Sequence, residues 1–260
     1  MIIKNGLVFN AEGRFEEKEV YVEDEKISKT GEGEIIDATG LYVIPGLTDI
    51  HFHACVGYDF CDGTKEAISK MAEYELKNGI TTICPASMTF SEEKLSEIYK
   101  TAREYDGKEG AELVGINMEG PFISMEKKGA QNPKFIHKPD ADMFYRLQEA
   151  AGGLIKLVDI APETDGAIEC IKAIKDDVRV SVAHTAADYD EAKLAFDNGA
   201  KHVTHLYNGM NDFYHRSPGV IGAACDNEDV TVELIVDGVH SHPSTVRTTF
   251  KMFGDDRIIM

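Results

Sequence analysis

The chain has 260 residues and 43% of them are hydrophobic, which is enough for one large core. Its formal net charge of −19 makes nucleic acid and anionic membrane surfaces poor partners, and it would repel an anionic substrate at long range. No apolar run approaches the roughly 18 residues of a membrane-spanning helix, and the polar N-terminus lacks the features of a signal peptide. The five scattered cysteines fit a reducing cytoplasm.

Residues 1–46 predict a small β-domain, the first of two domains. The dipeptide Asn5-Gly6 indicates a hairpin, and apolar positions alternate around Val20, Val22 and Ile27. Because two-stranded fragments are weak alone, these strands should pack against further structure.

Residues 47–260 form the second predicted domain, in which strands alternate with helices. The strand-like runs are 47–53, 80–86, 112–119, 154–163, 179–185, 202–208, 230–238 and 257–260. Helices are expected over 64–78, which ends at Asn78-Gly79, and over 188–198, where Asp188 and Glu191 have capping spacing. Eight strand starts favour an α/β fold of the (β/α)₈ TIM-barrel type with its last βα unit missing. A dinucleotide-binding sheet is disfavoured because no GxGxxG follows the first strand.

Two histidines on the first barrel strand are candidate metal ligands. His51 and His53 stand at i and i+2, so strand alternation places both rings on the same face. Imidazole is a common ligand of zinc and iron. Taken alone, such a pair indicates a metal site no more strongly than it indicates chance or a solvated strand end.

Three more ligand-type residues end other strands: Glu119 on the third, His184 on the fifth and His205 on the sixth. Barrel enzymes build their sites at the carboxyl ends of the strands. Histidines with only a structural role would fall at random along strands and helices. The pattern therefore predicts one metal site at this edge.

The remaining histidines are interpreted differently. His202 is three residues before His205 and is read as a packing residue or helix contact, while His137 and His242 are read as surface residues. His240 follows Gly238 at the end of the seventh strand, where its imidazole could stabilise a developing oxyanion. A solvated loop histidine is the alternative.

Several motifs together carry a resemblance: PGLTDIHFH (45–53), NMEGPFIS (117–124), KKGAQNP (127–133), VAHT (182–185), VTHLYNGM (203–210) and DGVH (237–240). They resemble the N-acetylglucosamine-6-phosphate deacetylases, a family of the amidohydrolase superfamily, from about residue 3 onward. HLYN and MEGPF are far more specific than a lone HxH. The resemblance implies a (β/α)₈ barrel with a small β-domain built from both chain ends.

The resemblance implies roles for individual residues. Glu119, His184 and His205 become the principal ligands of a divalent metal, zinc or iron, and the presence of His51 and His53 favours a second ion bridged by Glu119. Substrate contacts fall on Asn208, Gly209, His240 and Arg216, with Gln131 in a place where some relatives have histidine. Arg216 is expected to reach the phosphate in a neighbouring subunit's site, which implies a homodimer.

The activity implied is hydrolysis of the acetamide of an amino-sugar phosphate, N-acetylglucosamine 6-phosphate, in amino-sugar catabolism, by metal-activated water. The family's catalytic aspartate is expected about two residues beyond Met260, so a protein ending at Met260 would lack its acid–base group. One alternative is a cyclic-amide hydrolase with a modified lysine, for which Lys156 stands near the wrong end of its strand. The other is a metal-binding protein without catalysis.

Overall fold

The computed structural model describes residues 1–260 and divides into two compact units, Met1–Leu47 and Thr48–Met260. The first unit consists of two small sheets with strand orders β5-β4-β1-β6 and β3-β2-β7. Its strands are β1 (Ile2–Lys4), β2 (Leu7–Phe9), β3 (Phe15–Glu17), β4 (Val20–Glu23), β5 (Lys26–Ser28), β6 (Ile35–Asp37) and β7 (Tyr42–Val43).

The hairpin predicted at Asn5-Gly6 is wrong. Strands β1 and β2 do not pair with each other, because β1 pairs with β4 and β6 while β2 pairs with β3 and β7. Gly6 lies where the chain passes from one sheet to the other, and a Cβ there would come within 2.8 Å of Val43 and 2.9 Å of Ala38. The glycine serves close packing between the sheets and not a two-residue turn.

The hairpins of this unit lie instead between β2 and β3 and between β4 and β5, and in the second of them Val22 is opposite Ile27. The two turn residues, Asp24 and Glu25, both have positive φ, 49° and 60°. Positive φ at both central positions is the turn geometry that suits the twist of paired antiparallel strands.

The second unit contains the alternating strands and helices. Its parallel strands are β8 (Leu47–Asp49), β11 (Ile80–Ile83), β12 (Ala86–Ser87), β13 (Glu112–Leu113), β14 (Ile116–Met118), β15 (Ile155–Ile160), β16 (Arg179–Val182), β17 (His202–Val203), β18 (Thr231–Glu233) and β19 (Ile258–Ile259). Each of the eight predicted strand runs contains at least one of them. A short antiparallel pair, β9 (Ala54–Cys55) and β10 (Tyr58–Asp59), follows β8.

Seven helices connect these strands: α1 (Lys65–Lys77), α2 (Glu92–Arg103), α3 (Ala141–Ala150), α4 (Ala167–Ile174), α5 (Tyr189–Asn198), α6 (Gly219–Asp226) and α7 (Pro243–Phe253), with 3₁₀ turns η1 (Phe60–Asp62) and η2 (Pro133–Phe135). The two helices predicted over 64–78 and 188–198 are confirmed as α1 and α5. Thr64 caps α1, and the predicted Asp188–Glu191 box caps α5. No helix is long and apolar enough to cross a membrane.

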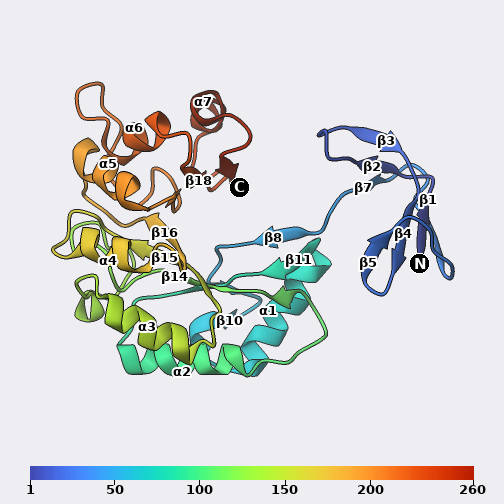
Figure 1. Cartoon of the computed structure of the whole chain (residues 1–260), viewed down its shortest axis with the longest axis horizontal. Coiled ribbons are helices and arrows are strands. Elements are labelled where there is room, and N and C mark those ends of the chain that lie inside the picture. Colours follow the sequence, from blue (N-terminus) through green and yellow to red (C-terminus); the bar gives the residue numbers. More distant parts are fainter. The chain divides into compact units, whose positions relative to one another are not determined.

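The strand order confirms the predicted α/β fold of TIM-barrel type. Strands follow one another in chain order in two sheets, β13-β11-β8 and β12-β14-β15-β16-β17-β18-β19, with helices on their outer side (Figure 1). No pairing joins β19 to β8. The main core packs apolar strand residues such as Ile116, Val158 and Val180 against helix residues such as Phe144 and Ile171. Because the strands are parallel, their carboxyl ends meet at one edge.

Candidate metal centre

The candidate ligands follow the carboxyl ends of different strands. Glu119 comes directly after β14, while His184 and His205 each stand two residues beyond β16 and β17. His51 and His53 also lie past their strand, because β8 ends at Asp49. Their rings converge nevertheless, with centroids 5.5 Å apart, so they approach one another from irregular backbone and not from one strand face.

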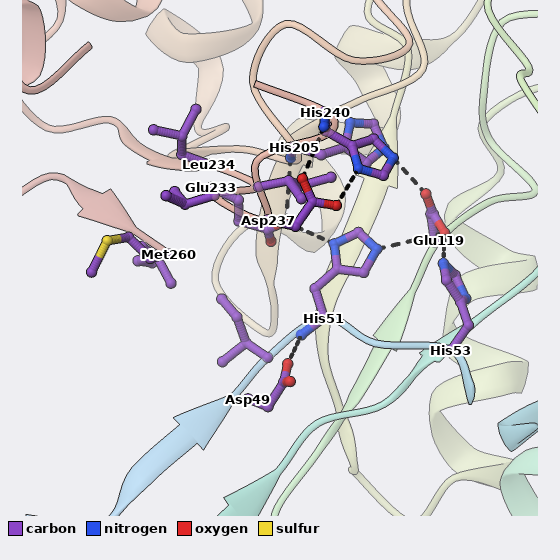
Figure 2. A pocket seen from close by; sticks show the side chains of 14 residues that line it. Asp49, His51, His53, Glu119, His205, Glu233, Leu234, Asp237, His240 and Met260 are labelled. Atoms are coloured by element: carbon purple, nitrogen blue, oxygen red, sulfur yellow. Dashed lines mark hydrogen bonds and ion pairs between the residues drawn. The ribbon is translucent and has the colours of Figure 1, made fainter. Parts of the chain in front are cut away.

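Glu119 is the residue on which the histidines converge. Its Oε1 lies 2.7 Å from His184 Nε2 and 3.2 Å from His205 Nε2. Its Oε2 lies 2.9 Å from His53 Nε2 and 3.7 Å from His51 Nε2. The carboxylate, 3% exposed, therefore faces one histidine pair with each oxygen. Figure 2 shows Glu119 between His51 and His53.

Two groups of side chains have the spacing of a metal site: His51, His53 and Glu119, and Glu119, His184 and His205. In each group the ligand atoms lie within 4.8 Å of one another. All five predicted ligands are therefore brought together, with Glu119 common to both groups.

Three of the imidazoles have hydrogen-bond partners that leave Nε2 free to bind a cation. The Nδ1 atoms of His184, His53 and His51 face oxygen acceptors: the Lys127 carbonyl at 2.9 Å, the Ala86 carbonyl at 3.2 Å and the Glu233 carboxylate at 2.7 Å. A carbonyl or carboxylate oxygen can only accept, so each Nδ1 carries the hydrogen. In a neutral ring Nε2 then presents a lone pair toward Glu119.

Lone pairs facing a carboxylate repel unless a positive charge lies among them. His184 Nε2 and His205 Nε2 are only 3.1 Å apart beside the same carboxylate oxygen, and Glu119 Oε2 is buried without a hydrogen bond. Imidazole nitrogens and a carboxylate are the ligand types that zinc and iron accept. The residues present thus fit a divalent metal.

The close contacts among these side chains shift the pKa values of Glu119 and of two histidines. Burial alone would raise the pKa of Glu119, but the four histidines beside its carboxylate lower it well below its ordinary value. Burial alone would lower the pKa of His51 and of His184, but their bonds to carboxylates raise both. The protein therefore holds a buried anion that demands positive charge beside it.

The backbone at two ligands is strained. His184 and His205 have φ of 44° and 33°, in the left-handed region that costs non-glycine residues on the order of 1 kcal/mol or more. Hydrogen bonds hold the first of them: Ser124 N donates to His184 O at 2.8 Å, and Thr185 N donates to Gly209 O at 2.9 Å. This backbone conformation explains why the strands end before the ligands.

Gly209, a predicted substrate contact, packs against the histidines. Its φ is 61°, and a Cβ there would lie 3.0 Å from His184 Nδ1 and 3.4 Å from His205 Cε1. A side chain at this position would displace a ligand ring. Its neighbour Asn208 is half-buried, and its side-chain amide donates to Leu206 O at 3.3 Å.

A cavity of about 480 Å³ opens beside the centre, a size suited to a small molecule. Figure 2 shows its lining. The lining residues are Asp49, Ile50, His51, His53, Glu119, His205, Glu233, Leu234, Ile235, Val236, Asp237, His240, Ile259 and Met260.

His240 lines this cavity with its ring oriented by Asp237. His240 Nδ1 donates to Asp237 Oδ2 at 2.7 Å, while Asp237 Oδ1 accepts from the backbone N–H groups of Val239 and His240, each at 2.8 Å. The backbone and ring bonds from His240 lower the pKa of Asp237 to about 2. The Nε2 atom of His240 is left without a bond to Asp237.

Two predicted substrate contacts lie elsewhere. Arg216 is exposed in a surface depression with Asp188, Asp190 and Ser217, and it does not line the cavity of its own chain. Gln131 is buried, and its side-chain carbonyl accepts from Thr89 N at 2.6 Å, so it fastens the loop after the KKG turn.

Glu233 supports the centre although no pattern in the sequence predicted it, and His202 does more than the packing expected of it. His202 is not merely a packing residue, because its Nε2 donates to Glu233 Oε1 at 3.0 Å and Glu233 Oε2 accepts from His51. A glutamate in the apolar run VTVELIV was the available signal, since a buried carboxylate needs partners. His137 and His242 are exposed, as predicted.

The family model described as "Amidohydrolase family" matches residues 42–260. The chain is 37% identical to the N-acetylglucosamine-6-phosphate deacetylase of Bacillus subtilis (strain 168), across 100% of this chain and 66% of that protein. It is 31% identical to the Lysinibacillus sphaericus protein of the same name, across 100% of this chain and 70% of that one. The chain thus spans about two thirds of the length of these relatives.

One similar solved structure contains a sugar phosphate. It is a variant of the Mycobacterium smegmatis N-acetyl-D-glucosamine-6-phosphate deacetylase in complex with N-acetyl-D-glucosamine-6-phosphate. The identity is 28% and the TM-score 0.89, with 99% of this chain and 69% of that chain covered.

Proposed function

Because the chain belongs to the amidohydrolase family, whose members are generally metal-dependent, we propose that it hydrolyses the acetamide of N-acetylglucosamine 6-phosphate. The products are glucosamine 6-phosphate and acetate, and the reaction belongs to amino-sugar catabolism. The observation that carries the proposal is the convergence of four histidines on Glu119 beside a cavity lined by His240.

The five converging side chains would hold one divalent ion on each side of Glu119, and zinc or iron suits them equally. A bound divalent ion supplies Lewis acidity and makes water a nucleophile near neutral pH. The carbonyls of Lys127 and Ala86 keep the histidine lone pairs aimed at the centre.

His240 has the role of a hydrogen-bond donor to the substrate. Asp237 holds its Nδ1–H, so a protonated ring presents Nε2–H to the cavity. A donor placed there stabilises the negative charge that develops on the acetamide oxygen during attack. The resemblance assigns proton transfer to an aspartate shortly after Met260.

A cyclic-amide hydrolase is less well supported. Lys156 is exposed near the start of β15, where its Nζ donates to Gly153 O at 2.9 Å, and it does not line the cavity. A lysine in that position cannot bridge ions at the carboxyl ends of the strands.

The test is acetate release by metal-reconstituted protein that extends through the predicted aspartate. Three substrates are compared: N-acetylglucosamine 6-phosphate, its C4 epimer and unphosphorylated N-acetylglucosamine. We expect metal-dependent release that is fastest with the first. The absence of acetate from all three, with metal confirmed bound, contradicts the proposal.

A further inference from the structure

We propose that Glu233 is a positioning residue of the metal centre, and that its carboxylate fixes His51 in the orientation and tautomer that ligate an ion. The ring orientation in the His51–His53–Glu119 group then depends on Glu233, whereas Glu233 reaches the Glu119–His184–His205 group only through the backbone N–H of His205. The inference rests on the proposed metal site but is independent of the proposed substrate.

Glu233 makes hydrogen bonds to three histidines. It ends β18 and is 6% exposed. Its Oε2 lies 2.7 Å from His51 Nδ1 and accepts from the backbone N–H of His205 at 3.3 Å. Its Oε1 accepts from His202 Nε2 at 3.0 Å. Both oxygens are therefore directed at histidines of the site or its support, as Figure 2 shows for His51 and His205.

The contact with His51 determines which nitrogen faces the centre. An ionised carboxylate has no hydrogen to donate, so His51 Nδ1 must carry one. Nε2 of the neutral ring is then unprotonated, and it points toward Glu119 Oε2 at 3.7 Å, which is longer than a hydrogen bond. Without Glu233, the other tautomer would place an N–H where a ligand lone pair is required.

A second histidine prevents Glu233 from turning away. His202 is fully buried on the neighbouring strand β17, and its Nδ1 lies 2.7 Å from Thr231 Oγ1 on β18. Its ring is held between Thr231 and Glu233, so Glu233 is held in turn on the side opposite His51. This gives the sequence motif H-V-T-H two different roles: His205 faces the centre, and His202 supports a residue that supports it.

The burial of Glu233 is difficult to explain by packing alone. Its neighbours along the strand, Val232 and Leu234, are buried and apolar, and an unpaired carboxylate there would cost several kcal/mol. A hydrophobic residue would fill the same place without this cost. A carboxylate is useful here because it binds the imidazole N–H of His51.

The test counts bound ions in the 260-residue chain without any substrate. Apo-protein is titrated with Zn²⁺ or Co²⁺, and bound metal is measured by plasma mass spectrometry and by the visible and EPR spectra of the cobalt form. Wild type is expected to bind two ions per chain. Glu233→Ala is expected to lower the affinity for one ion by roughly 10–100-fold or more and to leave the affinity for the other unchanged.

Two further variants separate positioning from charge or folding. Glu233→Gln keeps an oxygen that accepts from His51, and its amide can donate to His202 Nε2 once that ring carries its hydrogen on Nδ1. This variant should therefore bind both ions more tightly than Glu233→Ala. Glu75→Gln is the matched control, because Glu75 is a buried carboxylate on α1 whose side-chain partner is Cys55 and which contacts no histidine. It should bind two ions as wild type does.

Wild-type affinity for both ions in Glu233→Ala overturns the proposal, as does a folded Glu233→Ala that binds none. Loss of one ion in Glu75→Gln, or one ion only in wild type, also overturns it. If Glu233→Ala does not fold, ¹⁵N-histidine spectra of the ¹¹³Cd-loaded wild type decide. Coupling of cadmium to His51 Nε2, with a proton on Nδ1, is expected, and coupling to Nδ1 contradicts the proposal.

Discussion

Glu119 connects the two histidine pairs at the residue scale. Each of its oxygens faces one pair, so no other side chain belongs to both candidate metal groups. Its low exposure means that the negative charge cannot be screened by water and must be balanced by the centre itself. Both ion positions therefore depend on Glu119.

Replacing Glu119 with glutamine removes the charge while keeping the shape. Glu119→Gln is expected to weaken metal binding by more than about 100-fold, beyond the 10–100-fold typical of losing an outer hydrogen-bond partner. Equilibrium dialysis with Zn²⁺ measures it, with His137→Asn as the control because His137 is exposed outside the cavity. Metal retained at wild-type affinity in Glu119→Gln would contradict the account.

Asp159, inside the barrel, is expected to make the stability of the fold depend on pH. It is fully buried, its Oδ1 accepts from Thr204 Oγ1 at 2.7 Å, and its Oδ2 has no partner. Burial, together with the charge of Glu119, raises its pKa to about 7 from 3.8. Between these two values the unfolded chain has lost the proton while the folded chain keeps it. Stability therefore falls as pH rises from about 4 to about 7.

Asp159→Asn should remove this pH dependence from metal-free protein. We expect its free energy of unfolding to decline less than that of wild type between about pH 4.5 and 7.5, by up to a few kcal/mol. Urea unfolding at a series of pH values measures the difference. Asp176→Asn, at an exposed aspartate, should follow wild type. Parallel pH curves for wild type and Asp159→Asn would contradict the assignment.

At the scale of elements, the helices were the most predictable parts. Helix α5 begins at a reciprocal cap, in which Asp188 Oδ1 accepts from Glu191 N and Glu191 Oε2 accepts from Asp188 N, both at 2.9 Å. These contacts are local in sequence, so the residues alone specify them. Gly199 ends the helix in the same local way.

Asp188→Ala should destabilise the second unit by about 1 kcal/mol through loss of this cap, without changing metal affinity. The control is Asp190→Ala, an exposed carboxylate two residues further on with no capping bond. Chemical unfolding followed by circular dichroism measures both. Equal stability of Asp188→Ala and wild type would show that the cap contributes nothing.

The strands and the site were only partly predictable. The strand-end positions of Glu119, His184 and His205 follow from the apolar runs that precede them. The left-handed backbone at His184 does not, because distant groups such as Ser124 N and Gly209 O hold it. Asn5-Gly6 misled for the same reason: Ala38 and Val43, far along the chain, determine its packing.

Glu233 was missed because strand alternation hides a polar residue among apolar neighbours. Its partners, His51 and His202, are 182 and 31 residues away in the sequence. No local pattern reports such contacts. The carboxylate became meaningful only when the fold placed both histidines beside it.

At the scale of the whole molecule, the net charge of −19 opposes an anionic substrate, so cations must be supplied locally. Arg216 is exposed and lies outside the cavity of its own chain. A homodimer in which Arg216 reaches the partner's cavity stays a prediction, as does a cytoplasmic location.

Arg216→Ala tests the dimer prediction by binding. Loss of a charge-assisted bond to phosphate should lower the affinity for glucosamine 6-phosphate by roughly 10–100-fold and leave the affinity for unphosphorylated glucosamine unchanged. Calorimetry measures both ligands, and sedimentation is expected to give a dimer for wild type and variant. A monomer, or equal affinity of variant and wild type for the phosphorylated sugar, would refute it.

Anomalous diffraction can show whether the histidines around Glu119 form a metal centre. Crystals of zinc-reconstituted protein, measured on both sides of the zinc absorption edge, should give two anomalous peaks per chain. One peak is expected among His51, His53 and Glu119, and the other among Glu119, His184 and His205. No peak beside Glu119, with zinc present in the crystal, would contradict the account.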